Sequence, residues 1–196
     1  GDNIWTQEYS IAIAETASVF CELLLLNGLI KDSSTEQRMT LLAQKISMAA
    51  RLVVASYAHF HFEKAVYEQR QQKELSVEEL NDLMSAALQA AYGNSVDTSG
   101  AQWTWVCRRH LFGTKRNFYN FPYAFGFVLA SSLYSIYTKE PESFINKYKT
   151  FLRRSGKEGV AKAVSAIGID VHQMNCWKDV ITGLQQDLQE FTRRIE

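Results

Sequence analysis

A long segment without helix-breaking residues constrains the fold of this chain most. From Thr35 to Gln71 there is neither glycine nor proline. Apolar or small residues recur within it at spacings of three and four, which is the period of one face of an α-helix. These residues are Leu42, Ile46, Ala49, Ala50, Val53, Ser56, Tyr57 and Phe60. The segment therefore predicts one very long helix.

The rest of the chain indicates the same class of structure. It contains only two prolines, Pro122 and Pro141, and no segment shows convincing strand alternation. Further helices are expected at 10–30, 76–92, about 122–137, 141–154 and 157–166, and from a cap at Asp170 to 195. The segment 96–120 is expected to be a loop with one helical turn. We predict an all-α multi-helix bundle, organised as a single helical domain over residues 1–196.

Local signals set the ends and faces of these helices. Ser76 and Glu79 have the spacing of a capping box, in which each side chain satisfies the backbone amide of the other residue. Pro141 suits a first helical position. The first helix carries an apolar stripe that is expected to be buried. Its members are Ile13, Ala17, Phe20, Leu24 and Leu25.

Charge and hydropathy disfavour two classes of partner. Lys plus Arg and Asp plus Glu both number 21, so there is no net charge to attract nucleic acid or an anionic membrane. The longest apolar stretch near the start, from Phe20 to Ile30, is interrupted by Glu22 and Asn27. It is shorter than the roughly 20 residues that a bilayer span needs. We expect no nucleic-acid partner and no membrane partner.

The three cysteines also carry information about the compartment. Cys21, Cys107 and Cys176 are an odd number, lie far apart and form no CxxC pair. This pattern argues against a disulfide framework and against a thiolate metal site. Three reduced cysteines in a cytoplasmic protein are expected.

The histidine-rich segment around residue 60 does not make a metal site by itself. His59 and His61 are two residues apart, so they point to different faces of a helix. His59 and Glu63 share a face, but two ligands are too few for a zinc site. An aromatic helix surface with incidental histidines is the simpler interpretation. His172 is expected at the surface, in the first turn of the last helix.

A carboxylate in a small, apolar helix is the first feature that suggests chemistry. Glu15 lies in the segment Ile13–Ser18. A carboxylate in dry surroundings must be paired, protonated or bound to a cation. An ion pair or a surface position would explain Glu15 equally well.

The second such feature is a loop rich in aromatic and amide side chains. His110 is followed by the segment Asn117–Gly126, which includes Tyr119 and Tyr123. The two tyrosines are four residues apart, so in a helix they would share a face. Gly126 would allow a neighbouring helix to approach closely. A buried aromatic core is the alternative interpretation of this segment.

These two segments resemble the oligoendopeptidase F family of zinc metallopeptidases. Ala14–Ser18 is similar to the family's "AETAS" helix, and Phe118–Gly126 to its "FYNYPYxFG" region. Phe62-Glu63, Tyr92-Gly93 and Gly168-Ile169-Asp170 resemble further landmarks, and the likeness extends from about Ile4 to Phe191. The resemblance implies that the chain is the C-terminal helical part of a larger zincin peptidase.

The resemblance implies a role for each of four residues. Glu15 matches the third zinc ligand, while His110, Tyr119 and Tyr123 match groups that bind substrate or the tetrahedral intermediate. In such enzymes zinc polarises the scissile carbonyl and lowers the pKa of its water to about 7. Imidazole and phenol are suitable donors to the developing oxyanion. The substrates implied are short peptides.

The sequence departs from the family by lacking the HExxH motif, which supplies two histidine ligands and the general base. The chain alone is therefore expected to be inactive, to bind zinc weakly or not at all, and to need the missing N-terminal part of the same enzyme as its partner. Two alternatives remain open. One is a non-catalytic helical interaction module, and the other is a degenerate peptidase homologue that binds peptides without cutting them.

Overall fold

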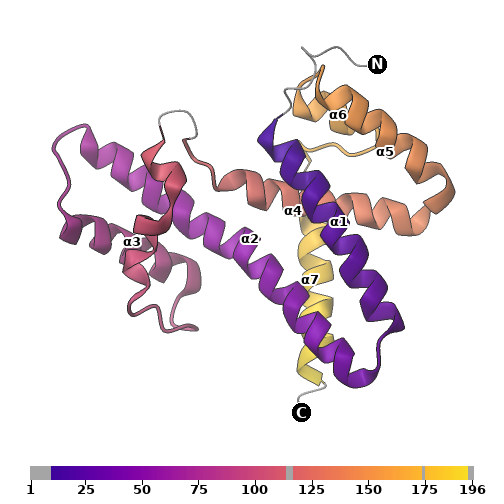
Figure 1. Ribbon diagram of the computed structural model, residues 1–196, viewed down its shortest axis with the longest axis horizontal. Coiled ribbons are helices and arrows are strands. Elements are labelled where there is room, and N and C mark those ends of the chain that lie inside the picture. Colours follow the sequence, from indigo (N-terminus) through magenta and orange to yellow (C-terminus); the bar gives the residue numbers. More distant parts are fainter. Residues whose placement is uncertain (1–9, 114–116, 174, 194–196) are drawn as a thin grey trace. The chain divides into compact units, whose positions relative to one another are not determined.

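Helices account for the regular structure of the described chain. The computed structural model describes residues 10–113, 117–173 and 175–193, and within these ranges it contains helices and no strand (Figure 1). The α-helices are α1 (Ile11–Asp32), α2 (Thr35–Arg70), α3 (Val77–Tyr92), α4 (Phe121–Lys139), α5 (Pro141–Ser155), α6 (Val160–Ser165) and α7 (Asn175–Arg193). Two 3-10 helices, η2 (Ala101–Cys107) and η3 (Arg109–Phe112), precede α4. The prediction of an all-α fold is confirmed.

The chain divides into two compact units. One holds the residues up to Ala49 together with those from Phe125 onward, and the other holds Ala50–Ala124. We call them unit 1 and unit 2. Two helices are shared, because α2 contributes 35–49 to unit 1 and 50–70 to unit 2, whereas α4 contributes 121–124 to unit 2 and 125–139 to unit 1. The single domain over residues 1–196 stays a prediction.

The core of unit 1 combines aliphatic and aromatic side chains. Phe20 of α1 contacts Phe144 and Tyr148 of α5, with ring centroids 5.4 and 5.0 Å apart, and Phe151 is fully buried beside Tyr148. Tilted aromatic contacts of this kind add to the gain from burial. Burial also raises the pKa of the Tyr148 phenol. The cluster holds α5 against α1.

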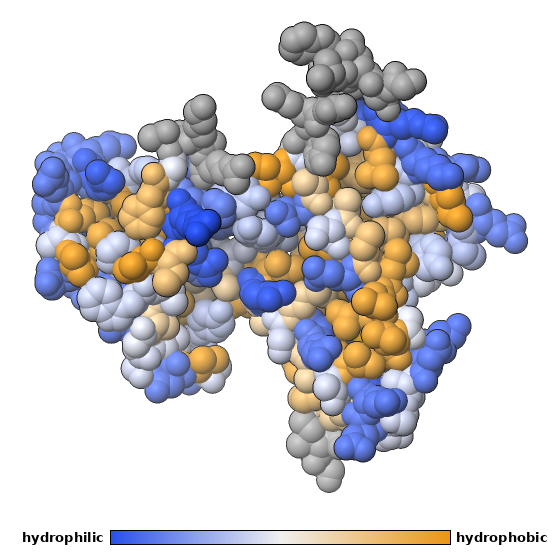
Figure 2. Space-filling view, viewed as in Figure 1, coloured by the Kyte–Doolittle hydropathy of each residue, from blue (hydrophilic) through white to orange (hydrophobic). Residues whose placement is uncertain are grey.

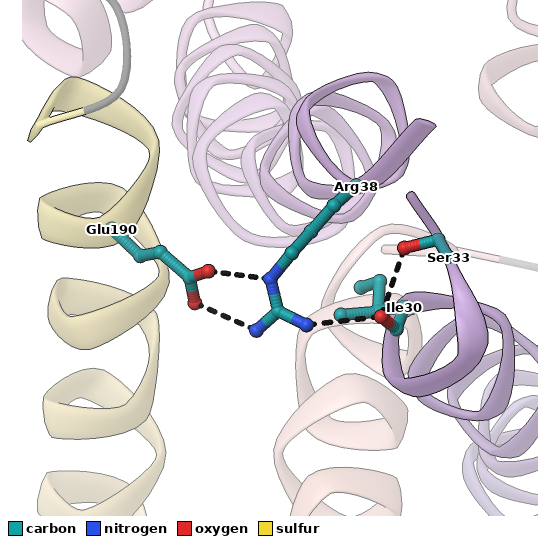
Figure 3. Close-up of polar contacts among 4 residues, drawn as sticks. All are labelled: Ile30, Ser33, Arg38 and Glu190. Carbon is teal, nitrogen blue, oxygen red and sulfur yellow. Dashed lines mark hydrogen bonds and ion pairs between the residues drawn. The ribbon is translucent and has the colours of Figure 1, made fainter. Parts of the chain in front are cut away.

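An arginine ties three helices of unit 1 together (Figure 3). Arg38 of α2 binds Glu190 of α7 through Nε and Nη2, at 2.5 and 3.1 Å. Its Nη1 donates to the carbonyl of Ile30, near the end of α1, at 2.9 Å. That carbonyl also accepts a hydrogen bond from the Ser33 hydroxyl. The arginine thereby satisfies a backbone acceptor that the helix end leaves open.

Unit 2 has a separate core between α2 and α3. Its buried members are Ala58, Phe62, Met84, Ala87 and Leu88. The capping box at the start of α3 is present: the Ser76 hydroxyl accepts from the amide of Glu79, and the Glu79 carboxylate accepts from the amide of Ser76. Trp105 of η2 donates its indole N–H to Asn81 of α3 at 2.8 Å. These contacts fix the segment that leads to η3.

The apolar stripe predicted for α1 is partly wrong. Ile13 and Phe20 are buried, but Leu25 is 64% exposed and Leu29 is exposed too. The buried face instead includes Ala12, Thr16, Val19 and Leu23. Figure 2 shows hydrophobic surface over the part of unit 1 that holds α1. Apolar residues of this helix therefore lie on both its buried and its exposed faces.

By length and composition alone, α1 could span a membrane. Its most apolar 18-residue window has a mean hydropathy of 1.6. The expectation drawn from 20–30 alone was too narrow, because it left out the apolar first half of the helix. A third of the window is buried within the structure, and core helices and signal sequences pass the same test. The absence of a membrane partner stays a prediction.

The last helix begins later than expected. Asp170 does not cap it, since its carboxylate accepts from the amide of His172 at 3.0 Å in a turn before the helix. The helix starts at Asn175, so His172 lies in that turn and is exposed. Asp is as suited to such turns as to helix caps, and the sequence alone does not separate the two.

Candidate active site

Helix α1 places Glu15 at a close crossing with α4 in unit 1. Glu15 is half-buried, and the next residue, Thr16, is fully buried with its hydroxyl donating to Ala12 at 2.6 Å. A Cβ on Gly126 of α4 would lie 3.0 Å from the Glu15 Cβ and 3.1 Å from the Thr16 nitrogen. A larger residue would push the two helices apart by a few tenths of an ångström, so glycine allows the close approach that the sequence predicted. The crossing fixes the backbone from which the Glu15 carboxylate extends.

The other three predicted site residues, His110, Tyr119 and Tyr123, come together in unit 2. The imidazole of His110 in η3 stacks on the ring of Tyr119, with centroids 4.1 Å apart and planes 30° apart. The ring of Tyr119 meets that of Tyr123 edge-on at 5.4 Å. All three side chains are half-buried. They therefore form one polar aromatic group with an imidazole and two phenols.

The backbone just before Tyr119 has an unusual conformation. Phe118 has a φ of 54°, and it is the one residue other than glycine with a positive φ in the described ranges. A bulky side chain in this region costs about 1 to 2 kcal/mol. Ring packing offsets part of this cost: the Phe118 ring packs against those of Phe60 and Tyr67, with ring centroids 5.3 and 5.5 Å away. Strained backbone of this kind gathers at functional sites.

The buried carboxylate of Glu63 accepts hydrogen bonds from this turn. Glu63 of α2 is only 4% exposed. Its Oε1 accepts from the Phe118 amide at 2.6 Å, and its Oε2 accepts from the Asn120 side-chain amide at 2.9 Å. Burial raises the pKa of the Glu63 carboxyl, while hydrogen bonds from Phe118, Tyr67 and Asn120 act in the opposite direction. Each polar partner of the carboxylate lies in the turn or one helical turn along α2.

Sequence reasoning missed this contribution of Glu63. It considered the residue only as half of a metal pair with His59 and as a family landmark. The local signal was weak, because Glu63 follows the apolar Phe62 but is itself followed by the charged Lys64. Once buried, however, its carboxyl needs a polar partner in the same way as Glu15.

The histidines near residue 60 behave as ordinary helix residues. His59 is half-buried, with its Nδ1 2.5 Å from the carbonyl of Ala55, and burial lowers the pKa of its imidazole. His61 is exposed, and its ring packs against that of Tyr57 at a tilt of 55°. The two histidines thus lie on different faces, as their spacing predicted.

The described residues do not fit a complete zinc site. Among them, no group of three or more His, Cys, Asp or Glu side chains is placed to hold a metal ion. Catalytic zinc needs three protein ligands, and Glu15 would provide one. Of the cysteines, Cys21 and Cys107 are exposed thiols, and the side chain of Cys176 lies outside the described part of the chain.

The large hollow of unit 1 is separate from these side chains. Its volume is about 780 Å³, and its walls come from α1, α2, α4, α7 and the turn before α7. It contains polar groups such as Lys45 and Asp187, which pair at 2.8 Å. None of the four predicted site residues lines it.

The described chain thus combines helices with a half-buried carboxylate on α1 and, in unit 2, a group of one imidazole and two phenols. The comparisons with known proteins show the class to which it belongs. The model for Peptidase family M3 matches residues 2–182. The chain therefore belongs to peptidase family M3, and the predicted kinship with metallopeptidases is confirmed.

The fold has a solved counterpart. The crystal structure of oligoendopeptidase-F from Enterococcus faecium matches with a TM-score of 0.80 and 21% sequence identity. The match covers 97% of this chain and 37% of that chain. At this identity the likeness shows the fold, which agrees with the predicted all-α helical bundle. No curated protein matches the chain.

Proposed function

We propose that this chain is part of a zinc endopeptidase of the oligoendopeptidase F type that hydrolyses short peptides. The family match across residues 2–182 carries the proposal, because it includes both the Glu15 helix and the aromatic loop. In this proposal Glu15 is the third zinc ligand. The other ligands and the general base come from an HExxH helix in another part of the same enzyme.

The aromatic group would supply donors to the substrate. An imidazole N–H and two phenol O–H groups can each donate to a carbonyl oxygen as it gains negative charge. The stacking of His110 on Tyr119 restricts the rotation of both rings. Restricted donors lose little freedom when the substrate binds, which favours a role in the transition state. We assign His110 and Tyr119 to this role, with Tyr123 as a third donor.

The experiment joins the chain to the gene's own upstream segment and measures zinc content and cleavage of a fluorogenic short peptide. Glu15→Gln should lose zinc and activity. Glu22→Gln, at an exposed position of the same helix, should keep both. Tyr119→Phe should keep zinc and lower kcat by about 100- to 1000-fold, the typical cost of one oxyanion donor. Full zinc content in Glu15→Gln would overturn the assignment of the ligand.

The same experiment separates the alternatives. Without the upstream segment, the chain should show no turnover. An upstream segment without HExxH would exclude the peptidase and leave the interaction module. Peptide binding without hydrolysis by the joined protein would indicate a degenerate homologue.

The cysteines bear on the cellular compartment of the protein. We propose a reducing, cytoplasmic location, and the exposed thiols of Cys21 and Cys107 support it. Thiol labelling of the protein in intact cells tests this point, since a reducing compartment leaves both positions open to the reagent.

A further inference from the structure

The turn at residues 117–120, just before α4, needs an external constraint to keep its shape. Phe118 has a φ of 54° within this turn, although nothing in a phenylalanine favours a left-handed backbone. Such a conformation persists only when the surrounding structure holds it. Tyr119 follows directly, so the Phe118 backbone determines where its phenol lies. The group that holds Phe118 therefore sets the orientation of Tyr119.

We propose that Glu63 is a positioning residue, which holds the turn at Phe118 and thereby keeps Tyr119 stacked on His110. The inference rests on the proposed function, because Glu63 would orient the Tyr119 phenol that is proposed to donate to the substrate. Glu63 is buried beneath the turn and binds it at two points, the Phe118 amide and the Asn120 side chain. It touches neither Tyr119 nor His110 through any of these hydrogen bonds.

The hydrogen-bonding pattern requires a carboxylate at this position. Both oxygens of Glu63 face N–H donors, at 2.6 and 2.9 Å. A glutamine would present its oxygen to one donor and its NH₂ group to the other. Asn120 cannot flip its amide to compensate, because its Oδ1 already accepts from the amide of Phe121 at 2.6 Å. A glutamine at residue 63 therefore leaves one donor of the turn facing another donor.

The surrounding rings restrict the turn without fixing its backbone. Phe60 and Tyr67, on the same helix as Glu63, hold the ring of Phe118. Tyr67 also donates its hydroxyl to the Glu63 carboxylate. Ring packing is compatible with several values of φ, whereas a hydrogen bond to the Phe118 amide fixes the direction of the peptide plane. The carboxylate is thus the element that selects the left-handed conformation.

The test uses the full chain with Glu63→Gln and Glu63→Ala, and Glu68→Gln as the matched control at an exposed position of the same helix. Two NMR quantities are measured. The first is the exchange rate of the Phe118 amide, with the Leu88 amide in α3 as the reference for general loosening. The second is the ring-current shift of the His110 imidazole protons caused by Tyr119. His61, whose ring packs against that of Tyr57, is the internal reference for that shift.

The proposal predicts local effects. In Glu63→Ala the Phe118 amide should exchange roughly 10- to 100-fold faster, as expected from the loss of a hydrogen bond to a charged group. The His110 shift should move toward its unstacked value, while Leu88 and His61 stay unchanged. Glu63→Gln should lose part of the His110 shift. Glu68→Gln should change nothing.

Three results would overturn the proposal. The first is a Glu63→Gln variant with the exchange rate and the His110 shift of the parent, and this variant decides the matter if Glu63→Ala does not fold. The second is faster Phe118 exchange with an unchanged His110 shift, because Glu63 would then hold the turn without positioning Tyr119. The third is an equal acceleration at Leu88, which indicates a general stabilising role. None of these readouts depends on peptide hydrolysis, so the failure of the proposed enzyme would be seen separately.

Discussion

Replacing Gly126 by alanine tests whether the crossing of α4 and α1 at Glu15 is as close as the structure shows. The new methyl group would meet the Glu15 Cβ at 3.0 Å, the Thr16 nitrogen at 3.1 Å and the Glu15 carbonyl carbon at 3.2 Å. Two of these atoms are backbone and the third is bonded directly to it, so no side-chain rotation relieves the contact. The two helices must separate by several tenths of an ångström.

Two opposing terms set the magnitude. Overpacking of a tight contact costs about 1 to 3 kcal/mol. Alanine is a better helix former than glycine by about 1 kcal/mol. Gly28 in α1 provides the matched control, because a Cβ there has no atom within 4 Å. Gly28→Ala should therefore gain only the stability that comes from the higher helix propensity of alanine. Subtracting the free energy of unfolding of Gly126→Ala from that of Gly28→Ala cancels this gain and leaves the packing cost, about 1 to 3 kcal/mol.

Urea unfolding followed by circular dichroism measures this difference. Gly28→Ala should unfold at a higher urea concentration than the parent, and Gly126→Ala at a lower one than Gly28→Ala, with unchanged m-values. Equal midpoints for the two alanine variants would refute the close crossing. In the joined enzyme, Gly126→Ala should also weaken zinc binding, because it displaces the backbone that carries Glu15.

Three further predictions concern stability and use the same unfolding assay. Ser76→Ala removes half of the capping box and should lower the free energy of unfolding by about 1 kcal/mol. An unchanged free energy of unfolding would show that the capping box does not stabilise the protein. Arg38→Gln breaks the paired hydrogen bonds to Glu190, and since both side chains are about a third exposed, the cost should be about 1 kcal/mol. Glu63 should make stability depend on pH. Burial raises the folded-state pKa of the Glu63 carboxyl, so folding favours its protonated form. This contribution to the free energy of unfolding is complete below the unfolded pKa of about 4.3 and is lost as pH rises through the folded pKa. Glu63→Gln should flatten the profile in that window, and an unchanged profile would contradict the assignment.

The sequence predicted well those features that depend on residues close together in the chain. The capping box at Ser76 and Glu79 needs only two residues at a fixed spacing, and the structure contains it. The long helix follows from the absence of breakers, and it runs from Thr35 to Arg70. The glycine at 126 predicted a close helix crossing, which the structure shows. In each case a local rule was sufficient.

Faces of helices were predicted less well, because they depend on what packs from elsewhere. Along α2 the pattern was treated as one stripe, but the helix belongs to two units. It buries Leu42, Met48 and Ala49 within unit 1, and Ala58 and Phe62 within unit 2. Ala50 and Tyr57, both members of the predicted stripe, are exposed. A single hydrophobic period cannot describe a helix with two cores.

In the candidate site, the sequence can indicate that an acidic residue needs a polar partner, but it does not indicate which residue that partner is. An acid in an apolar helix indicates an unmet need for a partner, and this is clear for Glu15 but much weaker for Glu63, which is followed by the charged Lys64. The sequence does not state which partner meets it: a cation, a base or a set of amides. Two partners of Glu63, Phe118 and Asn120, lie more than fifty residues away, on a turn whose left-handed residue is a phenylalanine that no local rule would place there. The burial of Glu63 therefore depends on a long-range constraint, whose nature becomes visible only when the distant donors are in place.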